Sequence, residues 1–186
     1  LMNPKVWEAS GHVESFVDPL VECKKCHKRF REDYLKDKSE CPECGGDLTE
    51  PKMFQGMFKT FIGATEDTSS LTYLRPETAQ GIFINFRNIL NTEHPSLPFG
   101  IAQIGKAFRN EITLGNFIFR TLEFDMMEIE YFTEPRDWEK YFGPRKKEMW
   151  QWLTDLGINE KNLRWREHGE DERSHYSKRT EDVEYH

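Results

Sequence analysis

Ala102-Gln-Ile-Gly-Lys-Ala-Phe-Arg-Asn-Glu111 and Phe119-Arg-Thr-Leu-Glu-Phe124 are the two stretches that decide how this sequence folds. The first predicts a strand through Phe108, a loop around Gly115 and Asn116 follows, and the second predicts the returning strand. An arginine fixed on such a strand can bind phosphate through its planar fork, while an aromatic ring can stack on a nucleobase and a carboxylate can accept a hydrogen bond from an exocyclic amine. By this chemistry alone, a nucleotide site and a salt-bridged hairpin are equally favoured.

The sequence after this strand–loop–strand unit predicts a half-buried strand. Met127, Ile129 and Tyr131 alternate with Glu128 and Glu130. Because alternate side chains of a strand point to the same face, the two glutamates should share one face.

The sequence before the unit predicts two helices and two short strands. At the start, Asn3 is a helix cap, Pro4 suits the first helical position and Gly11 suits the end. Residues 57–62 and 71–74 predict short strands, and a helix follows. The apolar residues that share one face of this helix are Ile82, Phe83, Phe86, Ile89 and Leu90.

The last part of the chain predicts one long helix and one strand. The helix covers residues 137–156 and is expected to be interrupted near Gly143-Pro144, and residues 163–166 predict the strand. Strands in series without regular βαβ alternation indicate an α+β fold built on an antiparallel sheet. Trp138, Trp150, Trp152 and Trp165 are predicted core residues.

The four cysteines stand as two Cys-x-x-Cys pairs, Cys23 with Cys26 and Cys41 with Cys44, separated by 14 residues. Four thiolates can close a tetrahedral zinc site, and four Cys ligands leave no open position for water, so the predicted zinc is structural. The stretch around them holds few apolar residues, which means that metal binding would supply much of its folding free energy. Unligated buried cysteines are the alternative, and His27 is expected to be a surface neighbour.

Composition limits the class of protein. The chain has 186 residues and a net charge of −7, which argues against a general basic face for nucleic acid. No apolar run is long enough to span a membrane and no signal peptide is recognisable, so a cytoplasmic protein without a membrane or DNA partner is expected. The sequence opens inside a helix-start signal and stops in mid-pattern, and we expect it to be a piece of a longer protein.

The stretch from Phe108 to Phe124 resembles motif 2 of the class II aminoacyl-tRNA synthetases. The neighbouring words resemble the dimeric glycyl-tRNA synthetases: Leu74-Arg-Pro-Glu-Thr-Ala-Gln-Gly81, Ala102-Gln-Ile-Gly-Lys-Ala-Phe-Arg-Asn-Glu111, and Leu122-Glu-Phe124 with Glu128-Ile-Glu-Tyr-Phe132. So do Met2-Asn-Pro-Lys-Val-Trp-Glu-Ala-Ser-Gly-His12 near the start and, in a connector region, His168 and His175-Tyr-Ser-Lys178. The resemblance covers nearly the whole chain.

The resemblance implies four segments of a catalytic domain. Residues 1–20 would open it, residues 21–50 would form the zinc-binding insertion, residues 51–135 would be the catalytic core with motif 2, and residues 136–186 would be a helical and connector region. Motif 1 would precede this chain, and motif 3 and an anticodon-binding domain would follow it. The partners implied are glycine, tRNA(Gly) and a second copy of the full-length enzyme.

The resemblance also implies the residue roles. Arg109 would hold the α-phosphate of ATP and orient the glycine carboxylate, Glu111 would contact the adenine amino group, and Phe124 would stack on adenine. Glu77 and Glu128 would hold the glycine ammonium, with Glu130 behind them. The further residues implied on the ATP side are Asn110, Phe119, Arg120, Thr121, Leu122 and Glu123, and those implied on the glycine side are Phe124, Asp125, Met126 and Met127.

The implied reaction needs positioning more than acid–base chemistry. The glycine carboxylate attacks the α-phosphorus, pyrophosphate leaves, and the tRNA hydroxyl attacks the mixed anhydride, with charge neutralised by arginine and Mg2+.

Two kinds of alternative stay open. Without a ligand, Glu77 would be a carboxylate beside a helix N-terminus and Phe124 a core aromatic ring. At the level of the molecule, the alternatives are a non-catalytic synthetase-like module that binds nucleotide or RNA, and another class II enzyme such as the threonyl or seryl synthetase.

Overall fold

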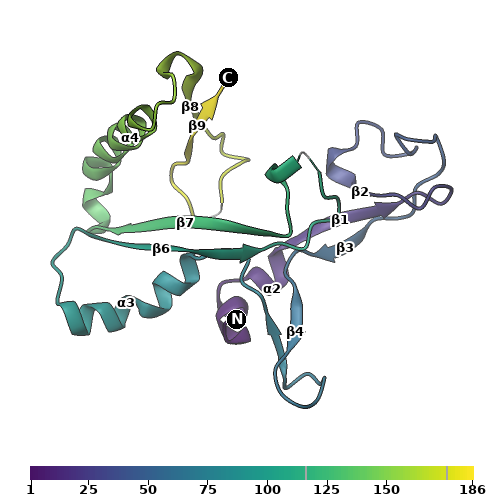
Figure 1. Cartoon of the computed structure of the whole chain (residues 1–186), viewed down its shortest axis with the longest axis horizontal. Coiled ribbons are helices and arrows are strands. Elements are labelled where there is room, and N and C mark those ends of the chain that lie inside the picture. Colours follow the sequence, from purple (N-terminus) through teal and green to yellow (C-terminus); the bar gives the residue numbers. More distant parts are fainter. Residues whose placement is uncertain (116, 175) are drawn as a thin grey trace. The chain divides into compact units, whose positions relative to one another are not determined.

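The computed structural model describes residues 1–115, 117–174 and 176–186. Asn116 of the predicted loop and His175 of the connector region therefore lie outside the described residues. The chain divides into two compact units, Leu1–Phe132 and Thr133–His186 (Figure 1). Each unit is described by itself.

The first unit begins with the predicted helix. In α1 (Pro4–Ala9), the Asn3 side chain accepts a hydrogen bond from the backbone N–H of Lys5 at 3.0 Å, as expected for an N-cap. Gly11 has φ +78°, a left-handed conformation that separates α1 from the short α2 (His12–Ser15). Trp7 of α1 is fully buried and forms the centre of a small core with Met57 and Tyr73.

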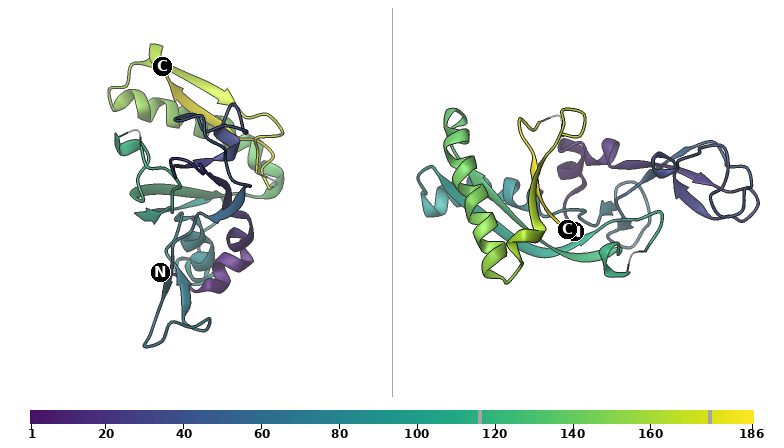
Figure 2. Two further views of the ribbon diagram at one scale, coloured as in Figure 1. Left: turned by 90° about the vertical axis from the view of Figure 1, so that its right-hand side faces the viewer. Right: turned by 90° about the horizontal axis from the view of Figure 1, so that it is seen from above.

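A three-stranded antiparallel sheet follows, in the order β2-β1-β3. Its strands are β1 (Val17–Glu22), β2 (Arg29–Arg31) and β3 (Lys52–Gln55), with a 3-10 turn η1 (Glu32–Tyr34) after β2. In the right-hand view of Figure 2, the loops that follow β1 and lead to β3 extend away from the rest of this unit. The sheet thus includes residues on both sides of the predicted 21–50 segment.

The middle of the first unit contains a second hairpin and a helix. β4 (Lys59–Phe61) pairs antiparallel with β5 (Leu71–Tyr73). The two strands lie within the predicted strands of residues 57–62 and 71–74. Helix α3 (Ala79–Glu93) then packs Phe86 against Phe99 and Phe132, with ring centroids 5.8 and 4.5 Å apart. Of the five predicted apolar positions only Ile82 is fully buried, because the remainder of this face has little of the described chain against it.

The longest hairpin joins β6 (Phe99–Phe108) to β7 (Glu123–Phe132). Alternation divides its side chains between a half-buried inner face, which α3 partly covers, and an exposed outer face. The strand through Phe108 is confirmed, and the predicted returning strand and half-buried strand are one strand, β7. It begins at Glu123 and not at Phe119, since Phe117–Phe119 form a 3-10 turn, η2, in the loop.

The second unit packs one helix beside a strand pair. It contains η3 (Pro135–Asp137), α4 (Trp138–Asp155), η4 (Glu160–Asn162) and the antiparallel strands β8 (Leu163–Glu167) and β9 (Glu181–Tyr185). The predicted interruption of the helix is wrong: α4 continues through Pro144, although this proline has no N–H to donate to the carbonyl one turn earlier.

The prediction that four tryptophans form the core is also wrong. Trp152 is exposed, and Trp138, Trp150 and Trp165 are only half-buried, because the second unit is one helix on a two-stranded sheet and has too few layers to enclose large rings. Trp150 instead stacks on Trp165 with a centroid distance of 6.0 Å.

Every strand pairing among the described residues is antiparallel, which confirms the predicted antiparallel architecture. In the part of the chain that the structure describes, no helix has the length and apolarity that crossing a bilayer requires.

Candidate functional site

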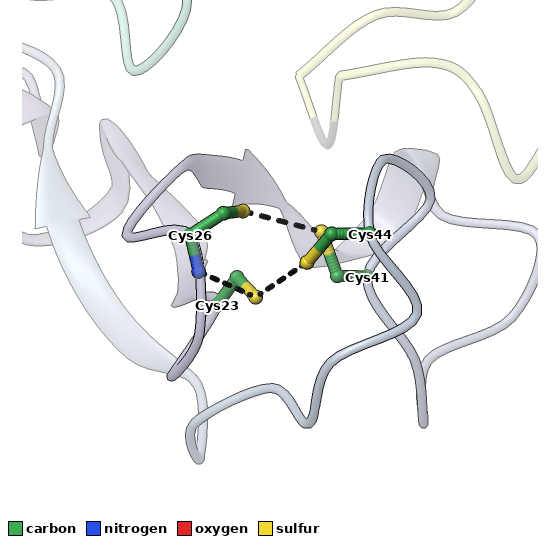
Figure 3. A group of neighbouring side chains, drawn as sticks. All are labelled: Cys23, Cys26, Cys41 and Cys44. Carbon is green, nitrogen blue, oxygen red and sulfur yellow. Dashed lines mark hydrogen bonds between the residues drawn. The ribbon is translucent and has the colours of Figure 1, made fainter.

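The four cysteines come together from two loops, Cys23 and Cys26 from the one between β1 and β2, and Cys41 and Cys44 from the one between η1 and β3 (Figure 3). All four sulfurs lie within 4.8 Å of one another, with Cys23 Sγ 3.5 Å from Cys44 Sγ and Cys26 Sγ 3.7 Å from Cys41 Sγ. A tetrahedral ion with Zn–S bonds of about 2.3 Å separates its sulfurs by roughly 3.8 Å. The observed separations fit a four-thiolate site and are too long for disulfides.

Each Cys-x-x-Cys pair is built on the same turn. The N–H of His27 donates to the carbonyl of Cys23 at 2.9 Å, and the N–H of Gly45 donates to that of Cys41 at 2.9 Å. His27 and Gly45 both adopt left-handed conformations, with φ of 57° and 64°. Two matching turns therefore present two sulfurs each to one point, and the exposed His27 stays outside the cluster, as predicted.

The backbone also favours thiolate at Cys23. The N–H of Cys26 is the largest cause that lowers the pKa of the Cys23 thiol to about 6, the N–H of Lys25 adds to it, and burial acts in the opposite direction. Because the metal ligand is the thiolate, this environment suits a metal.

Arg109 extends from the end of β6 over the inner face of the hairpin. Its Nε donates to the carbonyl of Pro76 at 3.2 Å, and its guanidinium lies 5.4 Å from the ring centroid of Phe124 and 5.7 Å from that of Phe16. Its own N–H donates to the carbonyl of Leu122 at 3.0 Å. Among the described residues, the hydrogen bond of the guanidinium is the one that Nε donates to Pro76, so the group is held at its root and its Nη donors can bind an anion.

Three carboxylates gather on the same inner face. Glu128 and Glu130 share it on β7, and Glu77 lies just before α3. Burial and then the negative charges of Glu128 and Glu77 raise the pKa of Glu130, which shows that the three groups are close enough to interact. The pKa of Glu77 is lowered, first by its hydrogen bond with His12 and also by the charge of Arg109.

The residues around Glu128 fix its position. The backbone N–H of Thr78 donates to Glu128 Oε2 at 2.6 Å, and the Thr78 hydroxyl donates to the same oxygen. With its amide nitrogen turned toward Thr78, Gln103 donates to the Thr78 carbonyl at 2.9 Å and accepts from Arg75 Nη1 at 3.0 Å. A side chain at Gly81 would place its Cβ 2.5 Å from the end of Gln103, so glycine suits this close approach.

The sequence that builds the arginine and carboxylate site matches a known family. The family described as the tRNA synthetase class II core domain (G, H, P, S and T) matches residues 60–184. The chain belongs to the class II tRNA synthetases.

Three similar proteins from within this class are all named glycine–tRNA ligase. The synthetase chain is 53% identical to the glycine–tRNA ligase of Treponema denticola over 100% of the chain and 42% of the relative. It is 52% identical to that of Streptomyces coelicolor and 53% identical to that of Thermobifida fusca, in both cases over 100% of the chain and 44% of the relative. The synthetase chain therefore spans less than half the length of these curated relatives. The class II resemblance is confirmed, and the threonyl and seryl alternatives are not favoured by these names.

The remaining motif 2 residues of the synthetase chain divide between the loop and the two strand faces. Asn110 is anchored, because its N–H donates to the Gly56 carbonyl at 2.7 Å. Glu111 lines a cavity of about 650 Å³ beside the cysteine segment, together with Asn110 and Leu122. Phe119 is exposed in the loop turn, and Thr121 donates to the carbonyl of Glu123 at 2.8 Å.

Alternation places part of the predicted run away from the carboxylates. The side chains of Phe124 and Met126 share the inner face with Glu128, whereas Glu123, Asp125 and Met127 lie on the outer face. Lys106, also on the outer face, is 3.4 Å from Glu123 and 3.2 Å from Asp125. Arg120 instead lies over the ring of Tyr34, at 5.8 Å from its centroid.

Three contributors to this site, His12, Thr78 and Gln103, were not predicted as site residues. All three lie within the sequence words that resemble the glycyl-tRNA synthetases, so a signal was present, but the words do not reveal which side chains touch the carboxylates.

Proposed function

We propose that the protein carrying this chain is a glycine–tRNA ligase. It activates glycine with ATP to glycyl-adenylate and transfers the glycyl group to tRNA(Gly). The relatives named above support this assignment, since each is a glycine–tRNA ligase and each matches along the whole chain.

The observation that carries the proposal is the group of three carboxylates beside one arginine. Burial and then the charges of Glu128 and Glu77 raise the pKa of Glu130, and a bound ammonium would offset the repulsion among the three acids. Glu77 and Glu128 would hold the ammonium of glycine, with Glu130 behind them, while Phe124 and Met126 line the same face. Asp125 and Met127 would contribute through their backbone. Glycine has no side chain to recognise, so gripping its amine is the means of selection.

ATP would bind along the inner face toward the loop. Arg109 would bridge the α-phosphate and the glycine carboxylate, two anions that repel each other as they approach, and Phe124 would stack on adenine beside Glu111. The remaining residues that we propose on the ATP side are Asn110, Phe119, Arg120, Thr121, Leu122 and Glu123. Mg2+ would neutralise the phosphates, as ATP-dependent ligases require.

The cysteine cluster would hold one structural zinc ion through Cys23, Cys26, Cys41 and Cys44. Its fit rests on the sulfur separations and on the two matching turns, and four thiolates leave no position for a reacting water. We further propose that the whole protein acts in the cytoplasm as a homodimer.

Glycine-dependent exchange of pyrophosphate into ATP tests the function directly. The whole protein should catalyse exchange with glycine and not with alanine or serine. Glu128→Gln should weaken glycine activation by at least about tenfold, because a charge-assisted contact contributes roughly 1.5–3 kcal/mol, and should leave the KM for ATP nearly unchanged. A non-catalytic nucleotide- or RNA-binding module, the second candidate, would show no exchange with any amino acid.

A further inference from the structure

His12 lies at the corner between α1 and α2 and faces the carboxylate of Glu77. Its Nε2 is 3.3 Å from Glu77 Oε1, and the two side chains are only 15% and 25% exposed. The imidazole packs against two rings: Trp7 meets it edge-on at 5.4 Å between centroids, and Phe16 is tilted against it by 35° at 5.8 Å. The ring therefore has little freedom to turn away from the carboxylate.

The second ring nitrogen of His12 is also occupied. Ser10 Oγ lies 2.8 Å from His12 Nδ1 and 3.3 Å from the carbonyl oxygen of Trp7. If the hydroxyl donates to Nδ1, the neutral ring carries its proton on Nε2. If the hydroxyl donates to the Trp7 carbonyl, Nδ1 donates to the hydroxyl, and contact with the carboxylate then requires the charged ring. In both arrangements Nε2 presents a proton to Glu77.

Glu77 connects this pair to the acidic group. The carboxylate also interacts with Gln80 and with the charge of Arg109, and its own charge contributes to the raised pKa of Glu130. The orientation of Glu77 thus depends on His12, which lies 65 positions earlier in the sequence. Phe16 contacts both His12 and Arg109, so the corner between α1 and α2 supports the carboxylate of Glu77 and the guanidinium of Arg109.

We propose that His12 is a positioning residue, which holds the Glu77 carboxylate in the orientation that binds the substrate amine. The proposal rests on the proposed function, because it assigns to Glu77 a contact with glycine. His12 itself touches no substrate: it acts through Glu77, while Ser10 contacts its other ring nitrogen.

The kinetic test uses pyrophosphate exchange by the whole protein. His12→Phe keeps the packing against Trp7 and Phe16 but removes the donor, so it should raise the KM for glycine about tenfold, as loss of a hydrogen bond to a charged group would, while kcat and the KM for ATP stay within about twofold. His12→Gln, which restores an N–H, should recover part of the loss. His168→Phe is the matched control, since His168 also pairs with a carboxylate, Asp182, at 2.7 Å.

A double-mutant cycle distinguishes positioning from a separate structural effect. If His12 acts through Glu77, His12→Phe should add little to the KM defect of Glu77→Gln. Additive defects would overturn the proposal, as would a normal glycine KM in His12→Phe alongside a raised KM in Glu77→Gln. Thermal unfolding of each variant shows whether a defect reflects lost folding.

A titration separates this inference from the proposed function. In the 186-residue chain, the Glu77 carboxyl followed by carbon NMR should show a higher pKa in His12→Phe than in the wild type. An unchanged pKa would overturn the positioning role whatever the kinetics. A raised pKa combined with a normal glycine KM in Glu77→Gln would instead contradict the placement of glycine at Glu77.

Discussion

Arg109 is held by its neighbours while its guanidinium remains available, and this makes its replacement informative. We expect Arg109→Ala to lower the rate constant of adenylate formation more than it weakens substrate binding, because the contact strengthens as charge builds on the phosphoryl oxygens. Arg109→Lys keeps the charge but loses the planar fork, so it should restore only part of the rate. Single-turnover adenylate formation at saturating ATP and glycine measures both, with Arg87→Ala of the exposed face of α3 as the control. A rate for Arg109→Ala within about threefold of the wild type, well under the 1.4 kcal/mol of a tenfold loss, would contradict the role.

Glu130 gives a prediction about stability. Burial and the charges of Glu128 and Glu77 raise its pKa, so between the unfolded and folded pKa values the folded state binds more protons than the unfolded state. The free energy of unfolding should therefore fall as the pH rises through the folded pKa. Glu130→Gln should be more stable than the wild type at pH 7, and the difference should shrink as the pH falls toward the unfolded value of about 4.3. Thermal unfolding from pH 4 to 8 measures this, and Glu66→Gln in an exposed loop should show no such trend.

At this same scale, the sequence identified the chemical groups better than their contacts. Arg109, Glu77 and Glu128 could be selected from their motifs, whereas the pair between His12 and Glu77 depends on a long-range contact that no periodicity encodes. The strand pattern did predict that Glu128 and Glu130 share a face. The pattern could not show that the face of β7 with these two glutamates is the half-buried one, because α3 and the corner between α1 and α2 bury it, and their positions depend on the tertiary fold.

At the scale of the elements, strong local signals succeeded and weak ones failed. α1, α3 and the β6–β7 pair follow caps, apolar spacing and alternation. β1 was not predicted because Val17–Glu22 contains aspartate and proline, and β9 was missed because Glu181–Tyr185 is mostly charged; both compositions disfavour strands. These strands form because a partner strand supplies the hydrogen bonds, which is tertiary information.

The two Cys-x-x-Cys turns predict a measurable zinc content. Purified protein should contain about one equivalent of zinc per chain, since four thiolates close one site. Cys23→Ser should lose the zinc and the hydrogen-exchange protection of β1 and β2, because few apolar contacts remain to order this segment. His27→Asn is the matched control: asparagine tolerates the left-handed backbone, and the exposed histidine is outside the sulfur cluster, so zinc should be retained. Metal-free protein with full protection in this segment would contradict the prediction.

At the scale of the whole molecule, the outer face of the β6–β7 hairpin decides how the 186-residue chain should behave in solution. Ile104, Met127 and Ile129 lie there side by side and are 73%, 50% and 59% exposed. Contiguous apolar surface of this kind promotes association, and salt screens the opposing repulsion that a net charge of −7 causes.

We therefore expect the 186-residue chain to bind the apolar dye ANS and to scatter light as oligomers at high concentration. Replacing Ile104 and Ile129 together by lysine should reduce both signals, because two charges would interrupt the apolar surface at its centre. The matched control replaces Ile62 and Ile84, which are 57% and 52% exposed but belong to other surfaces, and it should leave both signals nearly unchanged. Equal effects of the two double variants would show that scattered apolar side chains, and not this strand face, govern association. A monomeric chain that binds no dye would show that the face is covered in solution.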